Sequence, residues 1–221
     1  MIRRFFGATL SLAAASALAA CEGGAPEGRN SQSQHLIYLH GRIVEDGLPA
    51  VSERYGEYRF DDIVSTFRDE GFEVTAPLRE ADADPYAHAD EISELVLEFL
   101  DRGVPPENIT IIGASKGAFI ASLVSDTMVG PQLRYVLLAG CSSGVNETFL
   151  SDGREFNGHV LSIRDSSDTR LAGTCAPVAE QSERLASFEE IVTETGLEHG
   201  LIFTPHEAWV QPSLDWANRP I

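Results

Sequence analysis

Residues 111–120, IIGASKGAFI, decide how this chain is interpreted. An apolar run ends against Gly113, and an apolar stretch with helical character restarts after Gly117. Gly-x-Ser-x-Gly between a strand and a helix is typical of a nucleophile elbow, a tight turn that lifts a serine oxygen above the edge of a sheet. Glycine is needed at both ends because a side chain would collide with the turn or with the packed helix. We therefore predict that Ser115 is a nucleophile, with the N-terminus of the following helix directed at developing negative charge.

Short apolar strands alternate with amphipathic helices on both sides of this stretch. Strands are predicted at 35–41, 72–77, 107–115, 133–140, 159–165 and 188–195, and helices at 57–70, 84–103, 116–128, 177–186 and 207–216. Such alternation predicts an α/β fold, with a mostly parallel sheet of about six strands and helices on both faces. No linker or internal repeat divides residues 35–221, so we predict a single domain there.

Composition narrows the possible functions. The 221 residues are 43% apolar and 23% charged, which is ordinary for a globular protein with a substantial core. The formal net charge of −18 argues against a nucleic-acid partner, because phosphate backbones are bound through Lys and Arg. No His or Cys pair has the spacing of metal ligands, so we predict no metal site.

The N-terminus has the pattern of a secretory signal. Residues 1–20 combine a basic start, a short apolar core and small residues at the end. Residues 18–21, LAAC, are similar to a bacterial lipobox, in which cleavage leaves Cys21 as the lipidated first residue; plain secretion with a free Cys21 is the alternative. The polar, glycine-rich residues 21–34 then form a flexible tether. This pattern predicts an exported lipoprotein anchored to a membrane in the periplasm or on the outer surface.

Two further cysteines, Cys141 and Cys175, lie within the predicted domain. Export to an oxidising compartment favours a disulfide between them. Two buried, reduced thiols are the alternative, because sequence alone does not give the distance between them.

The acid and the base of a catalytic triad are sought at the carboxyl ends of strands, where open parallel sheets carry their functional groups. Asp165 ends the predicted strand 159–165 and Asp168 follows it; the strand-to-loop spacing favours Asp168, with Asp165 as the alternative acid. His199 lies in a glycine-flanked loop after the last strand and is the preferred base, with His206 as the alternative.

The first predicted strand ends in His40-Gly41, which would lie beside the elbow. The backbone amides of Arg42 and Lys116 are the predicted donors of an oxyanion hole. The side chain of His40 is expected to order this loop through its ring nitrogens rather than to take part in catalysis.

The order Ser115, Asp168, His199 on alternating strands and helices resembles the α/β-hydrolase superfamily. It is similar to a small bacterial lipoprotein-type branch whose histidine loop reads like residues 198–209, EHGLIFTPHEAW. Ala114 departs from the bulkier residue usual before the nucleophile, and the first two strands of the full fold are missing.

The resemblance implies a serine hydrolase that cleaves a small-molecule ester or related acyl bond through an acyl-enzyme, without a cofactor. The short stretch between the fourth and fifth strands implies a minimal lid or none. Thioesterases and peptidases use the same triad, so these activities are alternatives to an esterase. The sequence does not predict the oligomeric state. The alternative is a catalytically inactive protein of this fold that binds a ligand or partner in the cell envelope.

Overall fold

The computed structural model describes residues 33–130 and 132–220. The predicted signal at 1–20, the predicted lipidation site Cys21 and most of the predicted tether at 21–34 lie outside the described residues. Within the described ranges, no helix combines the length and the apolar character needed to cross a membrane.

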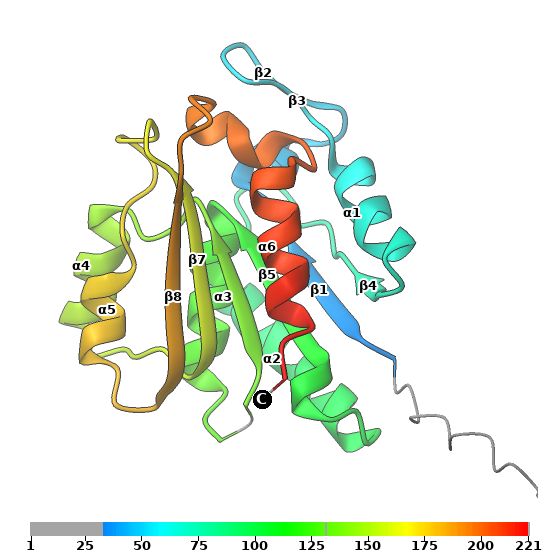
Figure 1. Cartoon of the computed structure of the whole chain (residues 1–221), viewed down its shortest axis with the longest axis vertical. Helices are drawn as coiled ribbons and strands as arrows, with labels where there is room; N and C mark the ends of the chain where they lie inside the picture. The colour runs from blue at the N-terminus through cyan, green and yellow to red at the C-terminus, as the bar shows by residue number, and fades with distance from the viewer. Residues whose placement is uncertain (1–32, 131, 221) are drawn as a thin grey trace, which may run out of the picture. The chain divides into compact units, whose positions relative to one another are not determined.

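Six parallel strands form the central sheet, in the order β4-β1-β5-β6-β7-β8 (Figure 1). The strands are β1 (His35–Leu39), β4 (Glu73–Thr75), β5 (Ile109–Ala114), β6 (Arg134–Leu138), β7 (Gly158–Asp165) and β8 (Leu185–Thr193). Every residue of β1, β5 and β6 is buried, as expected for parallel strands covered on both faces. The predicted α/β fold with a six-stranded parallel sheet is confirmed. The strand order reverses between β1 and β5, and the crevice outside the carboxyl ends of strands at such a point is where ligands bind in open α/β sheets.

Helices pack on both faces of the sheet. The helices are α1 (Phe60–Asp69), α2 (Pro85–Asp101), α3 (Lys116–Thr127), α4 (Ser143–Ser151), α5 (Ala176–Gln181) and α6 (Glu207–Ala217), with 3-10 helices η1 (Arg42–Asp46), η2 (Pro106–Asn108) and η3 (Glu198–Phe203). α1 and α6 share one apolar core with alternate residues of the strands, whereas α2 to α5 share the other. In β1, Leu36 and Tyr38 face the first core, and Ile37 and Leu39 face the second. This alternation is the period of two that a strand imposes on its side chains.

Three predicted boundaries were wrong by more than two residues. The helix predicted at 57–70 begins at Phe60, because residues 56–58 form strand β3 (Gly56–Tyr58), which pairs with β2 (Ala50–Ser52) in an antiparallel hairpin. The helix predicted at 177–186 ends at Gln181, since Ser182 adopts an extended conformation and its hydroxyl accepts a hydrogen bond from the Phe156 amide. The last strand therefore begins at Leu185 rather than at residue 188.

The stretch between β6 and β7 contains helix α4, which was not predicted. Phe149 of α4 is buried in the core shared by α2 and α3. Figure 1 shows this helix alongside the strands rather than beyond their carboxyl ends.

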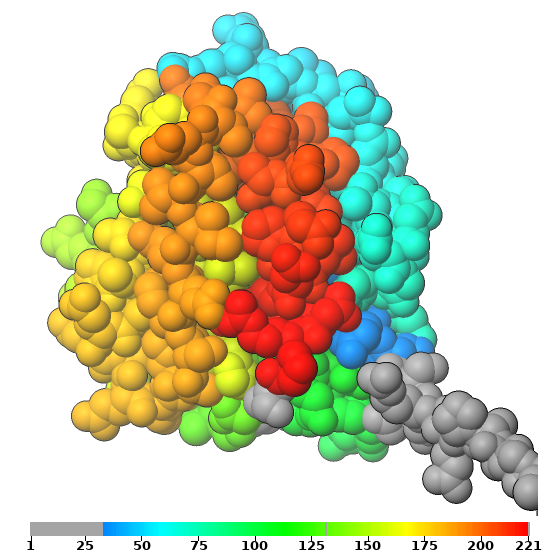
Figure 2. All heavy atoms as spheres, viewed as in Figure 1, coloured from blue at the N-terminus to red at the C-terminus, as the bar shows by residue number. Residues whose placement is uncertain are grey.

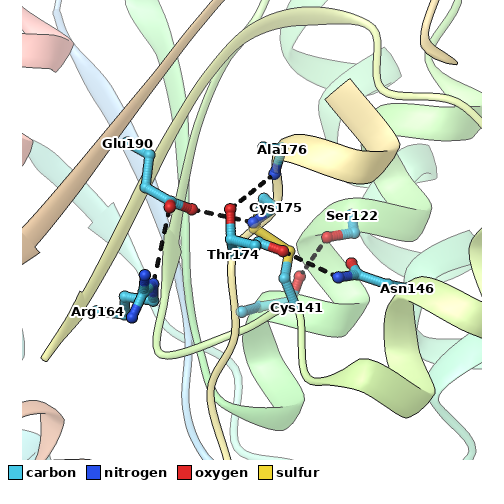
Figure 3. Close-up of a disulfide and its surroundings, with 9 residues drawn as sticks. Ser122, Cys141, Asn146, Arg164, Thr174, Cys175, Ala176 and Glu190 are labelled. Atoms are coloured by element: carbon cyan, nitrogen blue, oxygen red, sulfur yellow. Dashed lines mark hydrogen bonds and ion pairs between the residues drawn. A yellow bond between two sulfur atoms is a disulfide. The ribbon is translucent and has the colours of Figure 1, made fainter. Parts of the chain in front are cut away.

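Cys141 and Cys175 form a disulfide with an S–S distance of 1.97 Å (Figure 3). Next to it, the Asn146 side-chain amide donates to the Thr174 carbonyl at 2.9 Å, and the Cys175 amide donates to Glu190 at 3.0 Å. The bond joins the turn after β6 to the start of α5. It therefore holds the end of the loop between β7 and α5, which carries Asp168.

Candidate active site

Ser115 lies in the turn between β5 and α3, where its backbone adopts φ 54° and ψ −114°. Such a conformation costs a non-glycine residue on the order of 1–3 kcal/mol, and it persists only where neighbouring packing imposes it. The packing here is close. A Cβ on Gly113 would lie 2.2 Å from the Gly117 carbonyl oxygen, and a Cβ on Gly117 would lie 1.9 Å from the Leu39 carbonyl oxygen. Only glycine fits at these two positions, so the spacing of the motif is a steric requirement of the turn.

A continuous chain of hydrogen bonds joins Ser115, His199 and Asp168. The His199 Nδ1 atom lies 2.6 Å from Oδ2 of Asp168, and its Nε2 atom lies 2.9 Å from Oγ of Ser115. A carboxylate only accepts, so Nδ1 carries the proton and Nε2 is left to accept from the serine hydroxyl. Three residues from three separate connections after strands thus form the arrangement in which a histidine removes a proton from a serine.

The sheet brings these side chains together because each follows the carboxyl end of a parallel strand. Asp168 comes from the loop after β7, and His199 comes from η3, after β8. Both side chains are buried. Burial alone would raise the pKa of Asp168, but the hydrogen bond and charge of His199 and the amide of Leu171 hold this pKa below its usual value. The carboxylate therefore stays ionised beside the imidazole.

The alternative acid and the alternative base lie elsewhere. Asp165 accepts hydrogen bonds from the amides of Ser167 and Thr195, at 3.0 and 2.8 Å, and from neighbouring hydroxyls. Burial would raise its pKa, but these donors lower it well below the ordinary value. His206 precedes α6, and its Nδ1 accepts from the Ala208 amide at 3.1 Å. Asp165 thus caps its own turn and His206 caps a helix.

The two predicted oxyanion donors flank Ser115. Lys116 is the first residue of α3 and Arg42 is the first residue of η1, so no preceding helical turn supplies an acceptor for either amide. Both residues line the same cavity as Ser115. His40 is buried and joins the loop to its surroundings, with Nδ1 2.9 Å from the Gly41 carbonyl and Nε2 accepting from the Arg79 amide at 3.0 Å. The ring thus makes the ordering contacts expected of it.

A buried ionic network supports the same loop and was not predicted. The carboxylate of Glu45, in η1, accepts from Arg79 Nε and from Lys116 Nζ, both at 2.8 Å. Burial would raise the pKa of Glu45, but these two cations lower it. Since both carboxylate oxygens are engaged, η1 is tied to the first residue of α3. Glu45 is 34 residues from Arg79 and 71 residues from Lys116 in the sequence, so no local sequence pattern predicts these contacts.

A cavity of about 540 Å³ opens beside Ser115. Six large apolar or aromatic side chains line it, namely Ile43, Tyr55, Tyr58, Leu171, Ile202 and Phe203. Tyr55 and Tyr58 belong to the hairpin that sequence analysis missed. Among the residues that the structure describes, no three His, Cys, Asp or Glu side chains cluster as metal ligands. The site thus combines a serine–histidine pair with a mostly apolar pocket.

The stability of this site is expected to depend on the protonation of His40. Burial, with Arg79 nearby, lowers the pKa of His40 from 6.5 to about 4. In the unfolded chain the same ring takes up a proton below pH 6.5, so stability that is present above this pH is lost as pH falls towards 4. Between pH 7 and pH 5, the free energy of unfolding of the wild type should fall by up to about 2 kcal/mol more than that of His40→Gln.

Glutamine is the matched replacement because its amide both donates and accepts but does not titrate. Urea unfolding at the two pH values measures the difference. Burial also lowers the pKa of His88 and of His159. Both residues are present in the wild type and in His40→Gln, so their contributions cancel when the two pH dependences are compared. Equal pH dependence in the two proteins would contradict the assignment of a buried, neutral His40.

Comparison with solved structures identifies the fold. A candidate carboxylesterase from Lactobacillus plantarum superimposes with a TM-score of 0.60 at 16% identity, covering 86% of this chain and 91% of that chain. A phospholipase/carboxylesterase from Dyadobacter fermentans gives a TM-score of 0.57 at 13% identity, with coverage of 86% and 92%. Esterase PE8 gives 0.55 at 15%, with coverage of 82% and 91%. No protein-family model and no curated protein matches the sequence. The chain therefore has an α/β-hydrolase-like fold, with proteins described as esterases among its structural neighbours.

Proposed function

We propose that this protein is a serine hydrolase that cleaves a carboxylic ester or related acyl bond. The observation that supports this most is the chain of hydrogen bonds from Asp168 through His199 to Ser115, at 2.6 and 2.9 Å. The strained backbone of Ser115 adds support, because such strain is concentrated at functional sites. The choice of an ester over other acyl bonds rests on the names of the neighbours of this fold, which include a carboxylesterase and an esterase.

In the proposed reaction, Oγ of Ser115 attacks the carbonyl carbon of the substrate while Nε2 of His199 takes the hydroxyl proton. The carbonyl π electrons move onto oxygen, where the amides of Arg42 and Lys116 donate hydrogen bonds. Each such donor contributes roughly 3 kcal/mol to stabilising the transition state. Asp168 holds the ring in the required tautomer and stabilises the imidazolium.

Collapse of the tetrahedral intermediate breaks the bond between the carbonyl carbon and the alcohol oxygen. The imidazolium of His199 gives its proton to that oxygen, so the alcohol leaves neutral and the acyl group stays on Ser115. Water then attacks the acyl carbon while His199 takes a proton from it. The bond between that carbon and Oγ of Ser115 breaks, His199 returns the proton to Oγ, and the carboxylic acid leaves. No cofactor takes part in any of these steps.

We also propose that the enzyme acts outside the cytoplasm, anchored to a membrane through a lipid on Cys21. The signal pattern at residues 1–20 and the lipobox-like LAAC support export and lipidation. The disulfide between Cys141 and Cys175 fits an oxidising compartment.

A fluorophosphonate probe tests the proposed nucleophile. Incubation of the full-length protein in detergent should add the mass of one probe less HF, measured by intact-mass spectrometry, because Oγ of an activated serine bonds to phosphorus, fluoride leaves, and the serine proton is lost. Ser115→Ala and His199→Ala should add none within the same time. Ser52→Ala is the matched control, since Ser52 lines the same cavity; this variant should form the same adduct as the wild type.

The competing function is a binding protein that has this fold without catalysis. Folded wild-type protein that takes up no probe would favour it. Adduct formation that persists in Ser115→Ala would place the reactive group on another residue and would contradict the proposed mechanism.

A further inference from the structure

The two proposed oxyanion donors belong to different segments of the chain, and these segments meet at the nucleophile. The amide of Arg42 begins η1, and the amide of Lys116 begins α3. A Cβ on Gly41 would lie 3.7 Å from Cβ of Ser115, so the peptide that carries the Arg42 amide lies beside the serine. Two donors stabilise one developing charge only when both are directed at the same oxygen. The proposed reaction therefore requires a fixed position of η1 relative to α3.

One carboxylate joins these two segments. Glu45 belongs to η1, and its Oε2 accepts from Nζ of Lys116 at 2.8 Å. Its Oε1 accepts from Nε of Arg79 at 2.8 Å. The side chains of Glu45 and Arg79 have no exposed area, and that of Lys116 is 19% exposed. Hydrogen bonds between charged groups are short and strong, so this carboxylate holds the two segments at a defined distance.

Arg79 contacts the same loop at a second place. Its Nη2 donates to the His40 carbonyl, and its backbone amide donates to Nε2 of the same histidine. Nζ of Lys116 also donates to the Ala83 carbonyl, at 2.6 Å. Both cations are therefore anchored to backbone carbonyls, and the Glu45 carboxylate lies between them.

The chain after η1 is held by other contacts. It continues into the hairpin of β2 and β3, which Figure 1 shows beyond the carboxyl ends of the strands. The Arg59 amide, just after this hairpin, donates to the Phe203 carbonyl at 2.7 Å. In Figure 2, the cyan hairpin region lies against the orange histidine segment. These contacts connect the end of η1 to the segment of His199, whereas Glu45 supplies the link to the helix that follows Ser115.

We propose that Glu45 is a positioning residue that keeps the Arg42 and Lys116 amides directed at one oxyanion. This inference rests on the proposed function and deepens it. Glu45 is buried and lies outside the set of residues that line the cavity beside Ser115, so it acts through the two backbone segments rather than by contact with substrate.

Glu45→Gln should lower kcat on an ester. Glutamine has one acceptor oxygen in place of two, and its NH₂ group would face one of the two cations. We expect a loss of roughly 10- to 100-fold, because a displaced donor costs less than the 10²–10³-fold that follows removal of one.

A pair of substrates separates this role from a general structural one. In the thiono analogue of p-nitrophenyl butyrate, sulfur replaces the carbonyl oxygen, and sulfur is a weak hydrogen-bond acceptor. The ratio of kcat/KM for the ester to kcat/KM for the thiono analogue therefore measures what the donors contribute. Because the two substrates have nearly the same shape, changes in substrate binding cancel in this ratio.

The ratio should fall by about tenfold in Glu45→Gln, and also in Lys116→Met, which retains the backbone amide. The double variant should show no larger fall than the more affected single variant, because both changes break the same link. All variants are made in the full-length protein, and thermal unfolding shows which of them are folded.

Asp126→Asn is the matched control. Asp126 lies near the opposite end of α3 from Lys116, and its carboxylate accepts from Nη1 of Arg154 at 2.9 Å and from the Glu155 amide at 3.0 Å. Its side chain is 16% exposed, so the substitution also breaks a largely buried ion pair. This variant should lose stability but keep the substrate ratio of the wild type.

A ratio that falls in both single variants, falls no further in the double variant and is unchanged in Asp126→Asn supports the inference. An unchanged ratio in a folded Glu45→Gln or Lys116→Met variant overturns it, even if activity on both substrates falls equally. If Glu45→Gln does not fold, the ratio in Lys116→Met decides alone.

Two further outcomes also overturn the inference. A ratio that falls in Lys116→Met but rises in Glu45→Gln would show that the released ammonium stabilises the oxyanion directly. A double variant whose loss is the product of the two single losses would show that the two side chains act independently. A wild type that cleaves neither substrate overturns the proposed function, and this inference with it.

Discussion

Asp168→Asn should lower kcat on an ester by roughly 10⁴-fold. The asparagine amide would donate to Nδ1 of His199, so the ring would carry its proton on Nε2. That nitrogen could then no longer accept the proton of Ser115, although the side chains would keep their positions. Steady-state kinetics on p-nitrophenyl butyrate measures the loss, and thermal unfolding shows whether the variant is folded.

Asp165→Asn is the matched control for this experiment. Its carboxylate accepts hydrogen bonds from Ser167, Thr193 and Thr195, whereas His199 bonds to Asp168 and Ser115. We expect kcat within about tenfold of the wild type, and stability lower by roughly 1–3 kcal/mol because buried donors lose an acceptor. A large loss of kcat in Asp165→Asn together with an active Asp168→Asn would reverse the assignment of the acid.

Gly117→Ala should prevent the elbow from forming. The added Cβ would lie 1.9 Å from the Leu39 carbonyl oxygen and 2.8 Å from that of His40, and both are backbone atoms that cannot rotate away. Either the start of α3 or the end of β1 must shift, so we expect a loss of more than about 4 kcal/mol in the free energy of unfolding. Soluble yield and urea unfolding report this loss.

Gly144→Ala is the control for the same substitution elsewhere. This glycine lies in α4, and nothing stands within 4 Å of a Cβ placed on it. Alanine should therefore be neutral or stabilise the helix by roughly 0.5–1 kcal/mol. Wild-type stability and activity in Gly117→Ala would be incompatible with the close contact between the elbow and β1.

The elbow and the sheet could be read from sequence because their signals are local. Gly113, Ser115 and Gly117 meet steric demands within a single turn, and the apolar runs of β5 and β6 identify strands buried on both faces. Helix ends were less accurate. Gln181 ends α5 because Ser182 bonds to Phe156, which is distant in sequence.

Within the candidate site, the order of Ser115, an aspartate and a histidine was available from sequence. The choice between Asp168 and Asp165 depended on spacing alone, because Asp165 ends the strand and Asp168 follows it by three residues. In the structure their roles differ, since one carboxylate faces His199 and the other faces its own turn.

By itself, the sequence determined the α/β class, the parallel sheet and the position of the elbow, because periodicity and close packing at glycine act over a few residues. Only the tertiary structure decided which aspartate hydrogen-bonds to His199, how Glu45 joins η1 to α3, and that Tyr55 borders the cavity. These contacts join residues tens of positions apart, and their partners are set by how strands and loops converge at one edge of the sheet.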